Sequence, residues 1–120
     1  MRTVNIGTKL CTTVSATDEK EFGANHEYDI ALTQENPQEI VPVLCKIKFQ
    51  KGPVKEHGRN GIHNEDLIAI VIDRLQNLNS GNFKCRENSL AITRLEEALM
   101  WLNKRTQNRR ERGVEGTSTV

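Results

Sequence analysis

A change in hydrophobic period near residue 50 constrains the fold of this chain more than any other feature of its sequence. Before that point, apolar residues recur at every second position, the pattern of a strand with one buried face. Beyond His63, they follow the three- and four-residue spacing of helices. The sequence therefore predicts an α+β fold, in which a small N-terminal antiparallel β-sheet precedes a C-terminal antiparallel helical hairpin.

The predicted sheet occupies about residues 8–50 and contains three candidate strands. Segments 9–16 and 27–33 indicate two short strands, and segment 41–50 indicates the clearest one. In that last strand we expect one face to carry Val41, Val43, Cys45, Ile47 and Phe49, with Cys45 buried. A glycine-rich connector follows the sheet.

The predicted helical hairpin occupies residues 63–112. Its first helix has Asn64 as the predicted N-cap, and its apolar residues cover more than one face, which indicates burial against a second subunit. Its second helix is predicted from about Arg86 to Arg112, with Gly113 at the C′ position. We expect residues 114–120 to be a flexible tail and residues 1–120 to form a single domain.

The three cysteines are odd in number and have no metal-binding spacing. They are Cys11, Cys45 and Cys85. We expect them to be reduced and structurally inert, as in a cytosolic protein. The N-terminus lacks the apolar run of a signal peptide, and no apolar stretch approaches membrane-spanning length, so we expect no membrane partner.

Positive charge is concentrated in one short segment, residues 100–113. The whole chain carries a net charge of only +1, which argues against the broadly basic surface of a general nucleic-acid binder. This segment nevertheless holds five basic residues and one acid, Glu111, just after the only tryptophan. The basic residues are Lys104, Arg105, Arg109, Arg110 and Arg112. Any anion site is therefore expected to be local.

Helical spacing places Trp101, Arg105, Arg109 and Arg112 on one face of the second helix, with Arg110 off that face. An indole and a row of guanidinium groups suit a ligand with a flat ring and phosphates. A structural role is the alternative, because cations near a helix C-terminus complement the helix dipole. Trp101 would then be a core residue.

Three further groups have both functional and structural interpretations. Asn88 lies near the start of the second helix and either binds a base or ribose or satisfies backbone groups there. Gly58, Asn60 and Gly61 could expose backbone N–H groups to a phosphate. A third group contains two histidines and two acids: His57, His63, Glu65 and Asp66. Its spacing matches no metal-binding signature, and its two acids are typical of a helix N-terminus. We expect no metal, no cofactor and no catalytic residues.

Several motifs resemble the phage Thoeris anti-defence sponge family. They include "GPVKEHGRNGIHNEDLIAIVIDRLQ", "FKCRENSLAITRLEEALMWLNKRT" and "RGVEGT", which together span residues 52–117. The helical hairpin of this family is shared more distantly with the phage anti-CBASS sponges. The resemblance implies a non-enzymatic protein of the host bacterial cytoplasm that binds cyclic ADP-ribose isomers made by TIR-domain immune proteins. Some members also bind cyclic trinucleotides at a separate site, within a hexamer built as a trimer of dimers.

The resemblance also implies particular site residues. Asn88 matches the asparagine of the family's "REN" motif, and Arg105 and Arg109 match the two arginines of its last helix. A phenylalanine often stacks on the base in the turn after the first helix, and Leu78 stands at that position here. Phe83, Trp101 or an N-terminal residue is the alternative ring platform. Arg59, Asn60 and Gly61 are the candidates for a second site.

Two other classes of function stay open at this point. A hydrolase that consumes the nucleotide would use His57 or His63 as its general base, although no nucleophile–base pair is evident. A small DNA-binding regulator would use the arginine helix, although the near-neutral charge disfavours it.

Overall fold

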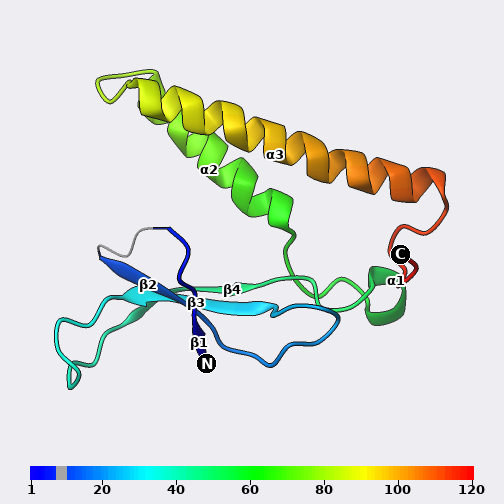
Figure 1. Cartoon of the computed structure of the whole chain (residues 1–120), viewed down its shortest axis with the longest axis horizontal. Helices are drawn as coiled ribbons and strands as arrows, with labels where there is room; N and C mark the ends of the chain where they lie inside the picture. Colours follow the sequence, from blue (N-terminus) through cyan, green and yellow to red (C-terminus); the bar gives the residue numbers. More distant parts are fainter. Residues whose placement is uncertain (8–10) are drawn as a thin grey trace. The chain divides into compact units, whose positions relative to one another are not determined.

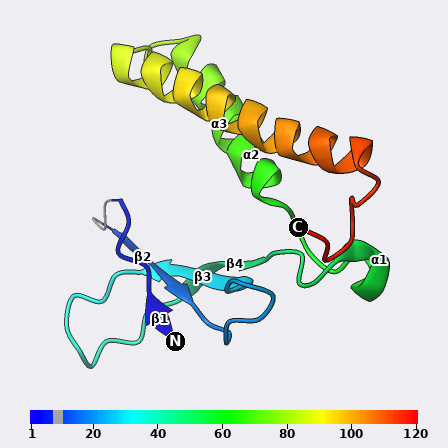
Figure 2. The same cartoon turned by 45° about the vertical axis from the view of Figure 1, so that its right-hand side comes forward.

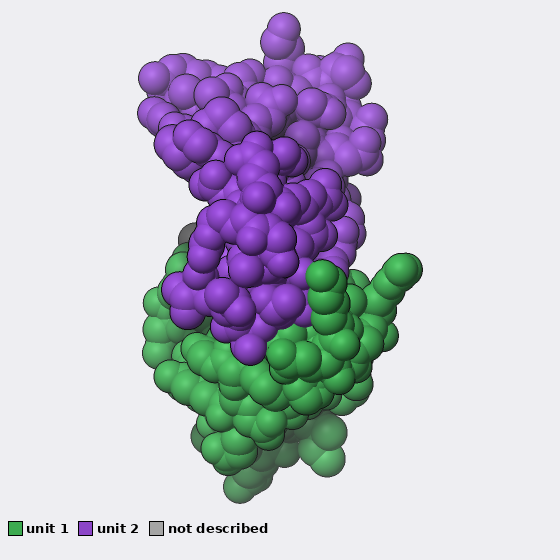
Figure 3. Space-filling view, turned by 90° about the vertical axis from the view of Figure 1, so that its right-hand side faces the viewer, with its two compact units in different colours: residues 1–62 green, residues 63–120 purple. Residues whose placement is uncertain are grey.

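The computed structural model describes residues 1–7 and 11–120, which form two compact units. Unit 1 spans Met1–Ile62 and unit 2 spans His63–Val120, shown in green and purple in Figure 3. Sheet and helices are divided between the units, which confirms the predicted α+β class. The prediction of a single 1–120 domain stays a prediction.

Unit 1 contains a four-stranded antiparallel sheet whose strands lie in chain order (Figure 1). The strands are β1 (Arg2–Thr3), β2 (Thr12–Ala16), β3 (Glu27–Leu32) and β4 (Val43–Lys48). The three predicted strands are therefore confirmed with shorter bounds, while residues 9–10 of the first lie outside the described residues. Strand β1 was not predicted, because two residues are too few to display a period.

A bulge in β4 changes which side chains share a face of the sheet. Ile30 pairs with Cys45 and Ala31 pairs with Val43, so Leu44 is an extra residue on β4. Directly paired residues lie on the same face, and consecutive residues of β3 lie on opposite faces. Val43 and Cys45 are therefore on opposite faces, and the prediction that they share one is wrong at Val43.

The more apolar face of the sheet contains Val14, Ile30 and Ile47. At one end of this face the rings of Tyr28 and Phe49 pack edge to face, with their centroids 5.8 Å apart. Ala16 is almost fully buried. Cys45 belongs to this face but is exposed, so its predicted burial is wrong. The physical reason is its position: β4 is an edge strand, with a neighbouring strand on one side only.

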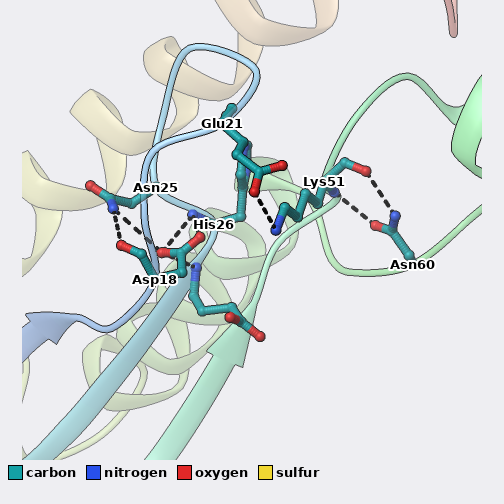
Figure 4. A network of polar contacts seen from close by, with 7 residues as sticks. Asp18, Glu21, Asn25, His26, Lys51 and Asn60 are labelled. Carbon is teal, nitrogen blue, oxygen red and sulfur yellow. Dashed lines mark hydrogen bonds and ion pairs between the residues drawn. The ribbon is translucent and has the colours of Figure 1, made fainter. Parts of the chain in front are cut away.

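The carboxylate of Asp18 organises the loop between β2 and β3 (Figure 4). It accepts hydrogen bonds from the backbone N–H groups of His26, at 3.0 Å, and Glu27, at 3.1 Å. The buried Asn25 side chain donates to the Asp18 carbonyl at 2.7 Å and accepts from Arg2 at 2.7 Å. Desolvation alone would raise the pKa of Asp18, but these hydrogen bonds outweigh it and hold that pKa below its usual range.

The connector between the sheet and unit 2 is more ordered than a glycine-rich loop, because it contains a one-turn helix, α1 (Val54–His57). Its two ends pair, since the N–H of Gln50 donates to the Ile62 carbonyl at 2.8 Å. Gly61 lies directly against the backbone of Phe49, where a Cβ would come within 2.4 Å of the carbonyl carbon and oxygen. Only glycine allows this close approach.

Unit 2 is a helical hairpin of α2 (Asn64–Asn79) and α3 (Arg86–Glu111), as predicted. The two views in Figures 1 and 2 agree that the helices run side by side, with α3 much the longer. Ile72 is buried between them. The N-cap of α2 is His63 rather than Asn64, because the Asp66 carboxylate accepts a hydrogen bond from the His63 N–H at 2.9 Å.

We expect the replacement Asp18→Asn to lower the melting temperature of the protein. The amide offers one acceptor in place of a carboxylate, and its NH₂ group would face the N–H donors of His26 and Glu27. Because the folded-state pKa of Asp18 is depressed, its contribution to stability is complete above its unfolded pKa, about 3.9. It is lost as the pH falls through the folded pKa.

Thermal unfolding followed by circular dichroism at pH 7 and pH 3 tests this prediction. Asp18→Asn should lower the melting temperature at pH 7 and reduce the further loss on acidification. The matched control is Asp29→Asn, which removes only a 3.7 Å ion pair with the exposed Lys46 and should have little effect. Equal melting temperatures for wild type and Asp18→Asn at pH 7 would contradict the role given to the Asp18 carboxylate.

We also expect Gly61→Ala to destabilise the protein by about 1–3 kcal/mol, the typical cost of inserting a methyl group where backbone must move. Gly81→Ala is the control, because a Cβ there meets nothing within 4 Å, and it should change stability by no more than about 0.5 kcal/mol. Urea unfolding of both variants measures the difference. If Gly61→Ala is as stable as Gly81→Ala, the Phe49 backbone can move away from the added methyl group without loss of stability.

Candidate ligand-binding site

The C-terminal half of α3 presents a basic hollow within unit 2. It measures about 530 Å³, and Trp101, Arg105 and Arg109 line it together, so the structure brings together three of the predicted site residues. Two further cations and a polar amide of α3 contribute to the lining. These are Lys104, Arg112 and Asn108. Arg110 is outside the lining, as its helical position predicts.

Four cations and one indole give this hollow its chemistry. Trp101 is 56% exposed, and the Lys104 ammonium lies 5.2 Å from its ring centroid, within cation–π range. The alternative that Trp101 is a core residue is therefore wrong. No acidic side chain is among the lining residues, so the hollow suits an anion that also carries a flat ring.

The chain after α3 folds back and forms one wall of the hollow. Gly113 has a positive φ of 71°, and the N–H groups of Gly113 and Val114 donate to the carbonyls of Arg110 and Arg109, which is a Schellman motif. One nitrogen of the Arg109 guanidinium then donates to the carbonyls of Val114 and Thr117, both at 3.0 Å. These bonds orient the half-buried guanidinium.

The tail is the part of the hollow that sequence reasoning missed. Thr117–Val120 line it, although residues 114–120 were expected to be a flexible tail, and their flexibility stays a prediction. The sequence did contain a signal for this return of the chain, namely Gly113 at the C′ position. A glycine there favours a Schellman motif, which reverses the chain direction at a helix end. Lys104 and Asn108 were also absent from the predicted site residues, although both belong to the basic segment.

The other predicted ligand residues gather at the turn between α2 and α3. Asn88 lies in the first turn of α3, and its side-chain NH₂ donates to the Phe83 carbonyl at 3.1 Å. The Phe83 side chain is 72% exposed. Leu78 is half-buried in the last turn of α2, one residue before that helix ends. Asn88 thus satisfies a backbone group, as its structural interpretation predicted.

The two groups of residues lie at opposite ends of one helix. At a rise of about 1.5 Å per residue, Asn88 and Arg105 are separated by about 25 Å along α3. A nucleotide-sized ligand bound to the arginines of one chain therefore cannot reach Asn88 of the same chain. Both groups can act on one ligand only if two copies of the hairpin supply them.

The connector residues proposed as a second site have internal partners. The Asn60 side chain accepts from the Lys51 N–H at 2.7 Å and donates to the Lys51 carbonyl at 2.8 Å (Figure 4). The N–H groups of Gly58 and Asn60 donate to the Val54 carbonyl and the Gln50 side chain. The prediction that these two N–H groups are exposed to a phosphate is therefore wrong. The side chain of Arg59 is exposed.

The two histidines of the hydrolase hypothesis do not line the hollow. The ring of His57 packs against the ring of Phe22, with the two ring centroids 5.0 Å apart, and His63 is the N-cap of α2. Among residues 1–7 and 11–120, no group of three or more histidine, cysteine or acidic side chains could hold a metal ion. Within that same part of the chain, no helix combines the length and the hydropathy of a membrane span.

Comparison with known proteins finds a family whose model matches the hairpin region of this chain. Residues 42–107 match the model of the Acb2/Tad1 hairpin domain. The chain is also 66% identical over 74 residues to a protein of Bacillus phage SBSphiJ7 named Thoeris anti-defense 1. That alignment covers 62% of this chain and 52% of the relative, so the chain spans about half the length of this curated relative.

The matched stretch contains all of α2 and most of α3, including Asn88, Trp101 and Arg105, and it ends two residues before Arg109. The resemblance drawn from the sequence motifs is thereby confirmed. The chain belongs to the Acb2/Tad1 hairpin family, that of the phage Thoeris anti-defence proteins.

Proposed function

We propose that this protein binds cyclic ADP-ribose isomers produced by TIR-domain immune proteins and sequesters them without cleavage. It would act as a phage anti-Thoeris protein in the cytoplasm of the host bacterium. The observation that carries the proposal is the hollow on α3, where Arg105 and Arg109 lie beside the exposed Trp101. Family membership and the name of the Bacillus phage relative support it.

The chemistry of the hollow fits that ligand class. A cyclic ADP-ribose carries a diphosphate, which planar guanidinium groups bind through paired charge-assisted hydrogen bonds. Its adenine offers a flat ring for which Trp101, Phe83 or the position of Leu78 is the candidate contact. The four cations of the hollow lie on one helix and its cap, so a chain of nearly zero net charge can still bind a dianion.

The ligand site requires a homo-oligomer. Since Asn88 and the arginines lie at opposite ends of α3, the arginines of one chain would meet Asn88 of a second chain. The apolar residues of α2 support this arrangement, because Ile70 is 63% and Val71 44% exposed in the single chain. A dimer is the minimum assembly, and a hexamer built from three dimers is the assembly that the family resemblance implies.

A cyclic trinucleotide is the second ligand that the resemblance implies, at a site separate from the hollow. Of the three residues proposed for it, Asn60 and Gly61 hold the connector together, so Arg59 is the one with an exposed side chain to offer. Arg59 is therefore the residue to replace in a test of trinucleotide binding.

A nucleotide hydrolase that uses His57 or His63 and a DNA-binding regulator are the competing functions. The histidines fall outside the hollow, and the arginines line an open hollow with the tail as one wall rather than a long basic stripe. Incubation with cyclic ADP-ribose, followed by heat denaturation and mass analysis, separates the classes. A sequestering protein returns the ligand intact, whereas a hydrolase returns linear ADP-ribose.

Arg109→Ala should weaken the binding of cyclic ADP-ribose by about tenfold to a hundredfold. The change removes one or two charge-assisted hydrogen bonds, each typically worth about 1.5–3 kcal/mol. Arg109→Lys should restore binding only in part, because lysine keeps the charge and loses the planar fork. Isothermal titration calorimetry measures both variants.

Arg110→Ala is the matched control, since Arg110 is the neighbouring residue and its guanidinium pairs with Glu115 outside the hollow. It should bind nearly as wild type does. If Arg109→Ala binds like wild type, or Arg110→Ala loses as much, the arginines serve only the helix dipole.

We expect Val71→Glu to lower the assembled mass or to unfold the chain. A carboxylate at an interface between subunits would be buried without a partner, which is costly. Light scattering at micromolar concentration checks the mass, and a wild-type monomer under those conditions would refute the oligomer. Glu97→Gln, an exposed change on α3 at the end of a weak ion pair with Arg94, should leave the mass unchanged.

A further inference from the structure

The side chain of Asn79 ties the end of α2 to the first turn of α3. Asn79 is the last residue of α2, and its amide oxygen accepts a hydrogen bond from the Cys85 N–H at 3.1 Å. Its amide nitrogen donates to the Ser89 hydroxyl at 2.9 Å. A single side chain thus holds two positions of α3, the N-cap and the first turn, through both ends of its amide.

These two positions flank Asn88 in the structure. Cys85 is the N-cap of α3, and its sulfur accepts from the Asn88 N–H at 3.4 Å. The thiol is therefore part of the helix cap, and the expectation that the three cysteines are inert stays a prediction. Ser89, the second residue held by Asn79, follows Asn88 directly in the chain.

The direction of the Asn88 side chain is also fixed. Its NH₂ group donates to the Phe83 carbonyl, so the end of the amide that remains for a ligand is the oxygen, an acceptor. Residues 80–87 of the turn have exposed side chains, so little packing holds this turn in place. The hydrogen bonds from Asn79 supply a constraint that packing does not.

We propose that Asn79 is a positioning residue for the binding of the cyclic nucleotide: it fixes the first turn of α3 so that Asn88 presents its amide oxygen to the ligand. This inference rests on the proposed function, in which Asn88 contacts the ligand. Holding an asparagine in its binding geometry before the ligand arrives avoids an entropy cost of ordering it on binding.

The chain offers a matched control for Asn79. Asn77 is the same residue type in the same last turn of α2, but its side chain donates at 3.3 Å to Asp73 of its own helix. Among the residues that the structure describes, its side chain makes no hydrogen bond with α3. Asn77→Ala therefore removes an exposed asparagine from α2 without touching the connection to Asn88.

Isothermal titration with cyclic ADP-ribose provides the first readout. Asn79→Ala should weaken binding about tenfold, the loss expected when a constraining pair of hydrogen bonds is removed, while Asn77→Ala binds as wild type. Asn79→Asp should restore binding, because its carboxylate still accepts from the Cys85 N–H and the Ser89 hydroxyl can reverse and donate to it. In the background of Asn88→Ala, Asn79→Ala should cause no further loss.

Amide hydrogen exchange in the ligand-free protein provides the second readout. Asn79→Ala should accelerate exchange at Cys85 and Asn88, and Asn77→Ala should not. If Asn79→Ala leaves those rates unchanged, or binds cyclic ADP-ribose as wild type does while Asn88→Ala is impaired, the positioning role is overturned and the proposed function stands. If the wild type itself does not bind cyclic ADP-ribose, the proposed function fails and the positioning role fails with it, whatever the exchange rates show.

Discussion

The packing of α2 against α3 is the interaction on which the rest of unit 2 depends. Ile72 is buried in that contact, and α3 extends well beyond α2. In proteins most of the stability of a helix comes from the packing of its apolar face, so each of these helices depends on the other. Every proposed ligand residue of the hairpin lies on α3, in the turn before it or at the end of α2.

The length of α3 also bears on how the proposed site would be assembled. The arginine face and Asn88 are about 25 Å apart along one rigid helix, which is too far for one small ligand. A pair of hairpins can bring the two ends together, and exposed apolar residues of α2, including Ile70 and Val71, offer a surface for that pairing. In this interpretation the oligomer is a condition for ligand binding rather than an added source of stability.

Local hydrogen bonding prepares both ends of α3. At the C-terminal end, Gly113 reverses the chain so that the carbonyls of Val114 and Thr117 orient the guanidinium of Arg109. At the N-terminal end, Asn79 and Cys85 hold the turn that carries Asn88. In the proposed site these bonds would set the plane of the Arg109 guanidinium and the orientation of the Asn88 amide before a ligand binds.

The sequence by itself determined the order of the elements, because the period of the apolar residues changes with the backbone geometry that can bury them. It also determined that Trp101, Arg105 and Arg109 share a face, since helical spacing alone requires this. The tertiary structure decided the bulge at Leu44, which moves Val43 off the face of Cys45, and the wall of the hollow formed by Thr117–Val120. It likewise decided that Asn60 binds Lys51 and that Asn79 reaches Cys85. These features depend on which groups meet across turns, and a pattern of residue types along one element carries no information about such meetings.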